Sequence, residues 1–323
     1  MHRLGFAVKV LGDGGLPSHD TRRWQSRPHL SSSLEKLEAI FERLQHLDVR
    51  MYRMASALAP YATHPDLPQF HRQVEECSEQ LARAGRRARE LDIRLSFHPG
   101  QYVVLNSERE EVRTTAAREL DTLAALLDAL GCGPEAVVVL HVGGIAGGRQ
   151  AALERFERGL EHVGEAGRRR LVIENDDRSF ALADVLELSH RCGLPVVWDV
   201  LHHHCLDPYE IPDAEALRAA LATWPDRVVA KIHFSSPKTS VETKRVRRGR
   251  RVETKLVLPP LRAHADTIDP IAFAGFLHGA AHEQRFDVLL EAKAKDLALL
   301  ALREALLTRG FTWQAGHLME APA

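Results

Sequence analysis

The residues of this sequence that are best suited to chemistry are histidines and carboxylates that directly follow apolar stretches. The clearest case is Leu171–Glu174, where three apolar residues that suit a buried strand run into a glutamate. A carboxylate at the end of a buried strand is costly unless something cationic meets it. Asp176 and Asp177, which come next, also suit the cap of a following helix, whereas Glu174 still belongs to the strand. We therefore predict that Glu174 is the centre of a metal site that other strands complete.

The pattern of an apolar strand followed by a polar side chain recurs along the chain. The further candidates, in chain order, are His98, His141, Asp199, His202, Lys231, His233, His264, Asp266, Glu291 and Lys293. A single histidine at a strand end is more often a hydrogen-bonded structural residue than a ligand, so the prediction depends on the repetition. Mixed imidazole and carboxylate ligation suits zinc, manganese or iron, and the lack of thiolates argues against a structural zinc site. These donors are too many for one ion and enough for two or three, and clustered ions serve phosphoryl chemistry.

Such a site needs a scaffold that brings successive strand ends together. Apolar strands alternate with amphipathic helices, which predicts a parallel sheet covered by helices. The predicted strands are 4–10, 49–55, 93–97, 136–142, the strand that ends at Glu174, 195–200, 228–234 and 288–291. Roughly eight strand–helix units fit an α/β fold of the TIM (β/α)8 barrel type, with the metal site at the C-terminal face of the strands. An open doubly wound sheet is the alternative, but no G-x-G-x-x-G follows the first strand.

The whole chain, 1–323, is predicted to form a single domain, because no polar linker separates the strand–helix units. We expect the barrel at about 4–307, a basic insertion at about 237–256 and a C-terminal tail at about 308–323. Ser32 and Glu35 predict a capping box at the start of the first helix.

Composition and charge exclude several classes of protein. The formal net charge is -1, so any basic surface for a nucleic acid must be local. The four cysteines form no C-x-x-C pair, which argues against a disulfide framework or a thiolate metal site. The N-terminus has no signal-peptide core and no apolar run could span a bilayer, so we expect a cytoplasmic protein with no membrane partner. No feature indicates a protein partner, and we expect a monomer.

Six motifs at the strand ends resemble those of a known family. They read H-P-G-Q-Y, L-H-V-G-G, I-E-N-D-D, W-D-x-x-H-H, K-I-H-F-S and L-L-E-A-K-x-K, and they occur in this order from the third strand to the eighth. The set resembles the UV damage endonuclease family, whose members are TIM barrels similar to the abasic-site endonuclease IV group. The resemblance extends from the first strand to about Leu307. It implies an enzyme that nicks double-stranded DNA 5′ to UV photoproducts, and also at abasic sites, leaving a 3′-hydroxyl for repair. A substrate of this kind implies association with the nucleoid.

The resemblance also implies a metal-ligand set. Carried over by motif, the ligands are His98, His141, Glu174, Asp199, His202, His233, His264 and Glu291, with Asp266 as a further candidate. Two or three divalent ions are implied, manganese first, with zinc or magnesium as alternatives. Glu174 would bridge two ions, and Lys231 and Glu291 join it as candidate catalytic residues. Leu201 makes the spacing after Asp199 unusual, so His203 competes with His202 for the ligand position.

Several residues are candidates for contacts with DNA. In H-P-G-Q-Y, Gln101 and Tyr102 resemble a lesion-probing pair, since an amide and an aromatic ring can fill the space left by displaced bases. Tyr102 could equally be a packed loop aromatic. Phe6 stands where the family usually has tyrosine, so any role of that hydroxyl is lost. Arg53 could hold a phosphate or pair with a carboxylate, and Lys293 shares the face of Glu291 on the eighth strand.

Lys231 and His233 alternate on the seventh strand and therefore point the same way. An ammonium group beside divalent cations is unfavourable unless it binds a phosphate or loses its charge. We predict that carbon dioxide carbamylates this amine and turns it into an anionic oxygen ligand.

The basic insertion contains a repeated tetrapeptide. Val241-Glu242-Thr243-Lys244 is repeated as Val252-Glu253-Thr254-Lys255, around a tip of Arg248-Gly249-Arg250. We predict a β-hairpin on which Arg247, Arg248 and Arg250 grip DNA phosphates; the alternative is a solvated charged loop.

Two other functions fit parts of the pattern. A TIM-barrel sugar isomerase or epimerase also places His, Glu and Asp around metals, but it has no use for the basic insertion. A non-catalytic DNA-binding metalloprotein would need a closed site, whereas these ligands are expected to face water.

Overall fold

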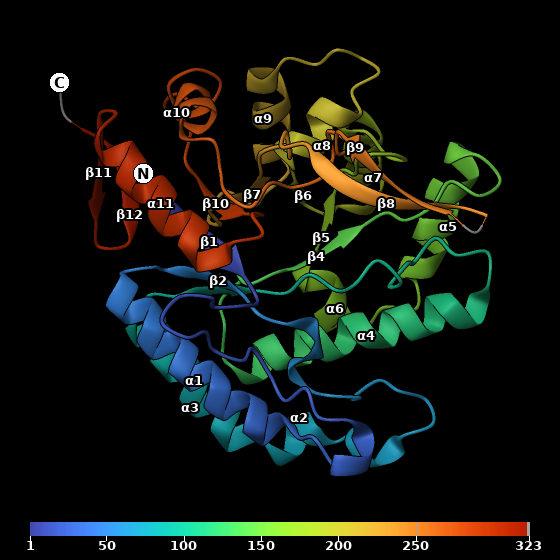
Figure 1. The fold of residues 1–323 in the computed structure, drawn as a ribbon. Coiled ribbons are helices and arrows are strands. Elements are labelled where there is room, and N and C mark those ends of the chain that lie inside the picture. The colour runs from blue at the N-terminus through green and yellow to red at the C-terminus, as the bar shows by residue number, and fades with distance from the viewer. Residues whose placement is uncertain (250, 322–323) are drawn as a thin grey trace.

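The computed structural model describes residues 1–249 and 251–321, and Figure 1 shows the course of the chain. Its strands are β1 (His2–Ala7), β2 (Met51–Arg53), β3 (Arg94–Ser96), β4 (Val138–His141), β5 (Leu171–Glu174), β6 (Val196–Val197), β7 (Ala230–Phe234), β8 (Glu242–Arg248), β9 (Arg251–Val257), β10 (Phe286–Leu290), β11 (Phe311–Gln314) and β12 (His317–Glu320). Its α-helices are α1 (Leu30–Leu47), α2 (Gln73–Glu76), α3 (Ser78–Glu90), α4 (Glu110–Ala129), α5 (Arg149–Leu160), α6 (Glu165–Arg170), α7 (Leu182–Cys192), α8 (Val200–Cys205), α9 (Asp213–Leu221), α10 (Pro270–His278) and α11 (Lys295–Leu307). Short 3-10 turns lie at Trp24–Ser26, Ser56–Leu58 and Pro68–Phe70.

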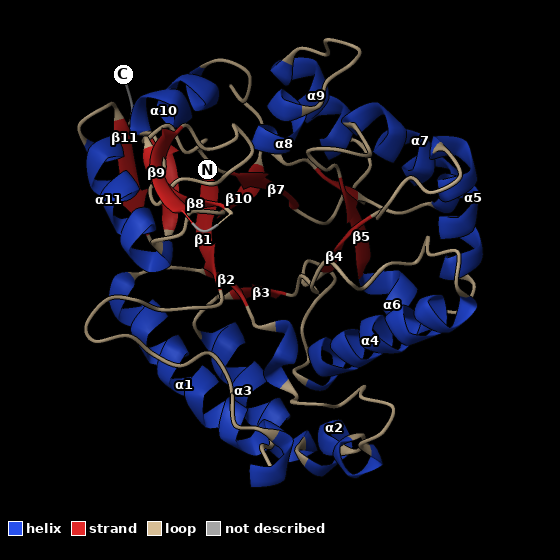
Figure 2. Ribbon diagram, turned by 45° about the vertical axis from the view of Figure 1, so that its right-hand side comes forward, coloured by secondary structure: helices blue, strands red, loops and turns tan. Residues whose placement is uncertain are grey.

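Parallel strands form a ring with the helices outside it (Figure 2). Parallel pairing gives the order β3-β2-β1-β10-β7 in one sheet and β4-β5-β6 in another. Single parallel bridges, Phe97 to Val138 and Asp199 to His233, link the two sheets at both junctions. The structure is a mixed α/β fold of the TIM-barrel type, in which the C-terminal ends of the strands share one face.

The helices cover the ring with the apolar faces that their sequences predict. On α1, for example, Leu34, Leu37, Phe41 and Leu44 recur at helical spacing and are all buried. In the ring, β5, β7 and β10 are entirely buried, as expected where both faces of a parallel sheet are covered. The repeated strand–helix pattern therefore produces the predicted core.

The start of α1 differs from the prediction. The helix begins at Leu30, before the proposed capping box of Ser32 and Glu35, and the side chain of His29 caps it by accepting from Ser31 N. The backbone N–H of Leu30 donates to Gln73 Oε1 at 2.8 Å, across 43 residues of sequence. This long-range acceptor satisfies a donor at the helix start, so a tertiary contact sets where the helix begins.

Two pairs of strands lie outside the ring, one in the basic insertion and one in the C-terminal tail. The predicted hairpin is confirmed as β8 and β9, which pair antiparallel from Glu242 opposite Val257 to Arg248 opposite Arg251. Arg250 at its tip lies outside the described residues. In the C-terminal tail, β11 and β12 form a second antiparallel pair, and β12 adds to β1 through His2 opposite Leu318. Within 1–249 and 251–321, no helix has the length and apolarity needed to cross a membrane.

A buried ion pair crosses the ring near the N-terminal ends of the strands. Arg94 on β3 donates to Asp287 Oδ2 on β10 at 2.9 Å, with side chains only 1% and 4% exposed. The same guanidinium donates to the carbonyls of Glu135 and Val229, and Asp287 also accepts from Arg3 N. Both charges are therefore paired and hydrogen-bonded, as burial requires.

We predict that Asp287→Asn lowers the free energy of unfolding by about 3 kcal/mol, because Arg94 would keep a buried charge without its counter-ion. Asp92→Asn is the control: Asp92 binds Arg3 at 2.8 Å but is 61% exposed, so its loss should cost less than about 1 kcal/mol. Urea denaturation followed by circular dichroism measures both. Equal losses in the two variants would contradict the assigned role of the buried pair.

Candidate active site

The carboxylate of Glu174 lies at the end of β5, fully buried, between imidazole rings that come from β4, β7, α8 and the segment after β3. Its Oε2 is 2.9 Å from Nε2 of His98 and 3.6 Å from Nε2 of His141. Its Oε1 is 2.8 Å from Nδ1 of His233 and 3.8 Å from Nδ1 of His202. Each oxygen of Glu174 thus faces a different pair of imidazoles. That is the arrangement a carboxylate bridging two cations would need.

The imidazole rings follow one another around this carboxylate. Ring centroids are 6.0 Å apart for His233 and His98, 5.0 Å for His98 and His141, and 5.6 Å for His141 and His202. His264, on the loop before α10, extends the series at 5.9 Å from His202. The side chain of His233 is fully buried whereas that of His141 is 30% exposed, so the cluster is closed at its base and open to solvent at one end.

Two further carboxylates face the same space. Asp199, the N-cap of α8, is buried, and its Oδ1 accepts from His202 N at 2.8 Å. Glu291 directly follows β10, and its carboxylate is 3.5 Å from Nδ1 of His233 and 3.7 Å from Nδ1 of His264. Three groups of side chains are close enough to hold an ion: His98, Glu174 and His233; His141, Glu174 and His202; Asp199, His233 and Glu291.

The charges of the cluster fit bound cations. Burial raises the pKa of Asp199 to about 7, and the nearby carboxylates of Glu174 and Glu291 add to that rise. Burial also opposes ionisation of Glu174, but His233 and His141 outweigh it and hold the pKa of Glu174 well below its usual range. Buried carboxylates that disfavour one another are stabilised by divalent cations.

Unsatisfied atoms point to the same conclusion. Among the described residues, no hydrogen-bond partner exists for His233 Nε2, His141 Nδ1 or Asp199 Oδ2, although all three atoms are buried. Buried polar atoms are normally satisfied, and lone pairs on nitrogen and oxygen are what a divalent metal takes up. The residues present therefore fit a metal-binding cluster.

Lys231 lies beneath the cluster on β7, fully buried, and its Nζ has no hydrogen-bond partner in the described part of the chain. Burial lowers the pKa of Lys231 well below its usual range, and the guanidinium groups of Arg94 and Arg53 lower it further. Both effects favour the uncharged amine, which is the form that can react with an electrophile.

The structure decides between the adjacent histidines. The His202 ring faces Glu174 and Asp199, and its Nδ1 is 3.1 Å from Asn175 O. His203 turns to the other side of α8, where Nε2 is 2.9 Å from Ile211 O and the ring packs against Trp198. His202, and not His203, belongs to the cluster.

The loop after β3 borders the cluster. A hollow of about 480 Å³ joins His98, His141 and His202 to Gln101 on this loop and to Gly143 after β4. Gln101 is exposed and Tyr102 is 80% exposed, so the Tyr102 ring is not a packed loop aromatic.

The remaining predicted residues are not among the three groups that could hold an ion. Asp266 and Lys293 are exposed, and Asp266 belongs to none of the three groups found among the described residues. Arg53 forms an ion pair with Glu291, which favours the carboxylate partner over a phosphate for this residue. Phe6 is fully buried against Tyr52, so it cannot contact DNA in this structure and leaves the set of DNA-binding candidates.

Sequence reasoning missed the residue that holds the strand ends in position. Asn175 donates from Nδ2 to Asp199 O at 3.0 Å and accepts from Asp199 N at 2.9 Å. This reciprocal pair ties the ends of β5 and β6 together, so Glu174 and Asp199 stay adjacent. An amide directly after the strand-end glutamate was the available signal.

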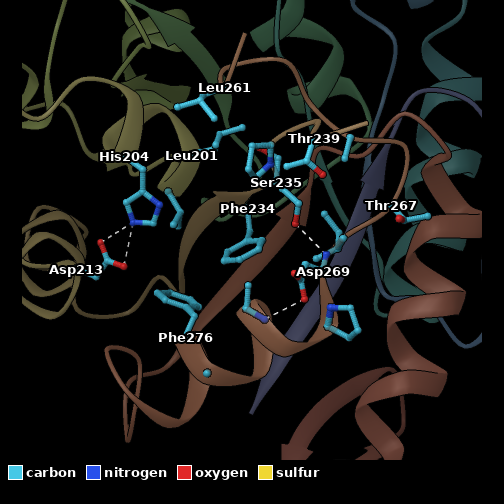
Figure 3. A pocket seen from close by; sticks show the side chains of 18 of the residues that line it. Leu201, His204, Asp213, Phe234, Ser235, Thr239, Leu261, Thr267, Asp269 and Phe276 are labelled. Atoms are coloured by element: carbon cyan, nitrogen blue, oxygen red, sulfur yellow. Dashed lines mark hydrogen bonds and ion pairs between the residues drawn. The ribbon is translucent and has the colours of Figure 1, made fainter. Parts of the chain in front are cut away.

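A larger hollow, of about 950 Å³, lies on the other side of α8 (Figure 3). Its walls are mainly apolar, and within it His204 Nε2 is 2.9 Å from Asp213 Oδ1. Its lining includes none of the candidate ligands, although several lining residues adjoin them in sequence. We place the chemistry in the smaller hollow, because the titratable groups converge there.

Comparison with known proteins assigns the family. A family model described as UV-endonuclease UvdE matches residues 30–311. The chain belongs to this UvdE family. It is 30% identical over 276 residues to the UV DNA damage endonuclease of Bacillus cereus (strain B4264), covering 84% of this chain and 80% of the relative. The resemblance seen in the strand-end motifs is confirmed, and this UvdE-family protein is an endonuclease.

Solved structures agree with this assignment. The crystal structure of SacUVDE is similar to this UvdE-family chain with a TM-score of 0.77 and 30% identity, covering 96% of this chain and 98% of that one. The structure of L-ribulose 3-epimerase has a TM-score of 0.54 at 15% identity, covering 98% and 92%. That second likeness shows a shared fold only, and it gives no support to the alternative of a sugar epimerase.

For Lys231 we predict a carbamate: the neutral amine adds to carbon dioxide, forming an N–C bond and releasing one proton. Protein equilibrated with 13C-labelled bicarbonate should show a carbamate carbon signal in its NMR spectrum, which Lys231→Arg should lack. Lys9→Arg, which replaces an exposed lysine, should keep the signal. A bare amine in high-resolution electron density, or no labelled carbon in the wild-type protein, would contradict the prediction.

Proposed function

We propose that this UvdE-family enzyme is a metal-dependent DNA repair endonuclease. It nicks one strand of duplex DNA 5′ to a UV photoproduct and leaves a 3′-hydroxyl, with abasic sites as a second substrate. The observation that carries the proposal is the geometry of Glu174, whose two oxygens face separate pairs of imidazoles. In the cell the enzyme would act in the cytoplasm, at the nucleoid.

The chain's own residues divide the work of the site. The site would hold two or three divalent ions, manganese first, with zinc or magnesium as alternatives. Glu174 would bridge two of these ions, and the rest of the cluster would supply the remaining ligands. Asp199 and Glu291 would close the buried side of the site. Bound ions supply an activated water and neutralise charge on the attacking and leaving oxygens. Arg53 fixes the orientation of Glu291 through its ion pair. Asp266 would join only if its loop moved toward the cluster.

The scaffold proposal follows from the strand pairing. The two single bridges would close the ring into an eight-stranded barrel, forming one domain with the metal site at the C-terminal mouth. The hairpin β8–β9 follows β7 and so leaves the barrel at this mouth. On it Lys244, Arg245 and Arg247 are exposed, which gives a nearly neutral protein local positive charge where DNA must approach.

Lesion recognition would come from the loop after β3. Gln101 and Tyr102 are exposed beside the hollow that contains His98 and His141. An amide and an unpacked ring there can fill the space left by displaced bases and stack on their neighbours. Lys293, exposed two residues after Glu291, would hold a phosphate beside the site.

A plasmid assay tests the function. With manganese, the wild-type enzyme should nick UV-irradiated supercoiled plasmid and spare untreated plasmid, and a chelator should stop the reaction. Glu174→Gln keeps the shape and removes the charge, so nicking should fall by about a hundredfold or more and metal content by elemental analysis should drop. Glu215→Gln, exposed on α9, is the control for the substitution itself. Full activity with full metal loading in Glu174→Gln would contradict the proposed role of this residue.

The hairpin is tested separately. Replacing Arg247, Arg248 and Arg250 by Ala should weaken binding to damaged and undamaged duplex alike and reduce the log-log salt slope by roughly one unit for each lost phosphate contact. Metal content should be unchanged. The control triple, Arg83, Arg86 and Arg118 to Ala, removes the same charge from exposed positions on α3 and α4. If the two triple variants bind with the same affinity and salt slope, the hairpin is not a DNA contact.

A further inference from the structure

The loop between β1 and α1 presents an exposed tryptophan among arginines. We call residues 22–27, Arg-Arg-Trp-Gln-Ser-Arg, the Trp24 turn. Trp24 is 46% exposed, whereas Trp198 and Trp224 are 0% and 7% exposed, and Trp313 is partly buried. An exposed aromatic ring of this size among arginines is a candidate interaction surface.

The turn is held rigidly, so its exposure is built into the fold. The Asp20 carboxylate is almost completely buried, and it accepts from Arg22 Nε at 2.9 Å and from the backbone N of His29 at 3.1 Å. The backbone N of Asp20 donates to Ser33 Oγ on α1 at 2.9 Å. Trp24 opens the 3-10 turn Trp24–Ser26, and Arg27 caps this turn in the left-handed conformation with φ 48°. The ring is therefore displayed from a fixed backbone.

The positive charge of the Trp24 turn is largely uncompensated. Arg22 is engaged with Asp20, but Arg23 and Arg27 are exposed and form no ion pair with any described residue. A hollow of about 570 Å³ beside the ring is bordered by Arg27 and, from the loop before α2, by Phe70. Unpaired arginines that flank an exposed aromatic residue in sequence suit a phosphodiester chain, whose phosphates bind the arginines while a sugar or base lies against the ring.

The turn lies at the same end of the fold as the candidate active site. It follows the C-terminal end of β1, and the strand ends at this face carry the cluster. The residues directly after the turn contact α2: Leu30 N donates to Gln73, and His29 is 3.2 Å from Glu76. Figure 2 shows α2 and the hairpin β8–β9 on opposite sides of the strand ring. DNA crossing the mouth between them would meet both.

We propose that the Trp24 turn binds the DNA that flanks the lesion, across the barrel mouth from the hairpin, with Arg23 and Arg27 on phosphates and Trp24 against a sugar or base. This inference rests on the proposed function as a DNA endonuclease. It gives the enzyme two separated contacts on one duplex, so that the lesion is presented to the cluster between them.

Tryptophan emission gives a direct readout, because Trp24 is the most exposed of the four tryptophans. Titration with a duplex that carries one UV photoproduct should quench part of the emission and protect it from acrylamide. Both changes should be absent in Trp24→Phe. Binding is followed independently by the anisotropy of labelled DNA. A wild-type enzyme that binds and nicks the damaged duplex while Trp24 emission and acrylamide access stay constant would overturn the proposal and leave the proposed function intact.

Affinity measurements supply the second readout. Arg23→Ala with Arg27→Ala should lower the salt slope by about two, and Trp24→Ala should weaken binding about tenfold. Arg83→Ala with Arg86→Ala, exposed on α3, is the control of equal charge. On duplexes of graded length, the deficits should grow as the flank becomes long enough to reach the turn. Deficits that are equal at every flank length, or that match the α3 control, would overturn the proposal. An enzyme that binds no DNA at all would overturn the proposed function as well.

Discussion

The burial of the Glu174 carboxylate is the constraint on which the rest of the site depends. A fully buried carboxylate needs compensating partners, and here the imidazole rings of His98, His141, His202 and His233 provide them. Asp199 and Glu291 bring further negative charge into the same space, and burial together with these neighbours raises the pKa of Asp199 to about 7. The protein groups alone leave several buried donors and acceptors unused. Divalent cations would complete the balance, which links the electrostatics of this site directly to its proposed chemistry.

The interior of the strand ring carries charge along its length instead of being filled with apolar side chains alone. At one end Arg94 and Asp287 form a paired and hydrogen-bonded unit. Lys231 follows on β7, where burial and the nearby guanidinium groups of Arg94 and Arg53 hold its pKa well below its usual range. The carboxylate and imidazole cluster occupies the other end. The paired ions tie strands together at one end of the ring, and the cluster of imidazoles and carboxylates lies at the other end, where substrate would arrive in the proposed function.

The net charge of this protein conceals local concentrations of positive charge. A formal charge of -1 would predict no attraction, yet exposed arginines gather on the hairpin β8–β9 and around Trp24. These segments leave strand ends at the face that holds the cluster, so positive potential is local to the mouth. The acidic residues of the site are buried beneath it, where imidazoles shield them. Attraction for the phosphate backbone and retention of cations can thus coexist on one face.

The sequence by itself determined the elements and the identity of most of the cluster. Alternation of apolar strands with helices specifies the ring, and polar residues at successive strand ends must then converge, because parallel strands share one C-terminal face. The repeated Val-Glu-Thr-Lys likewise specified the hairpin. Only the tertiary structure decided which of His202 and His203 turns inward, that Asn175 clasps Asp199, and that Phe6 is buried. Those outcomes depend on contacts between segments far apart in sequence, as does the start of α1 at the side chain of Gln73, and local periodicity carries no information about them.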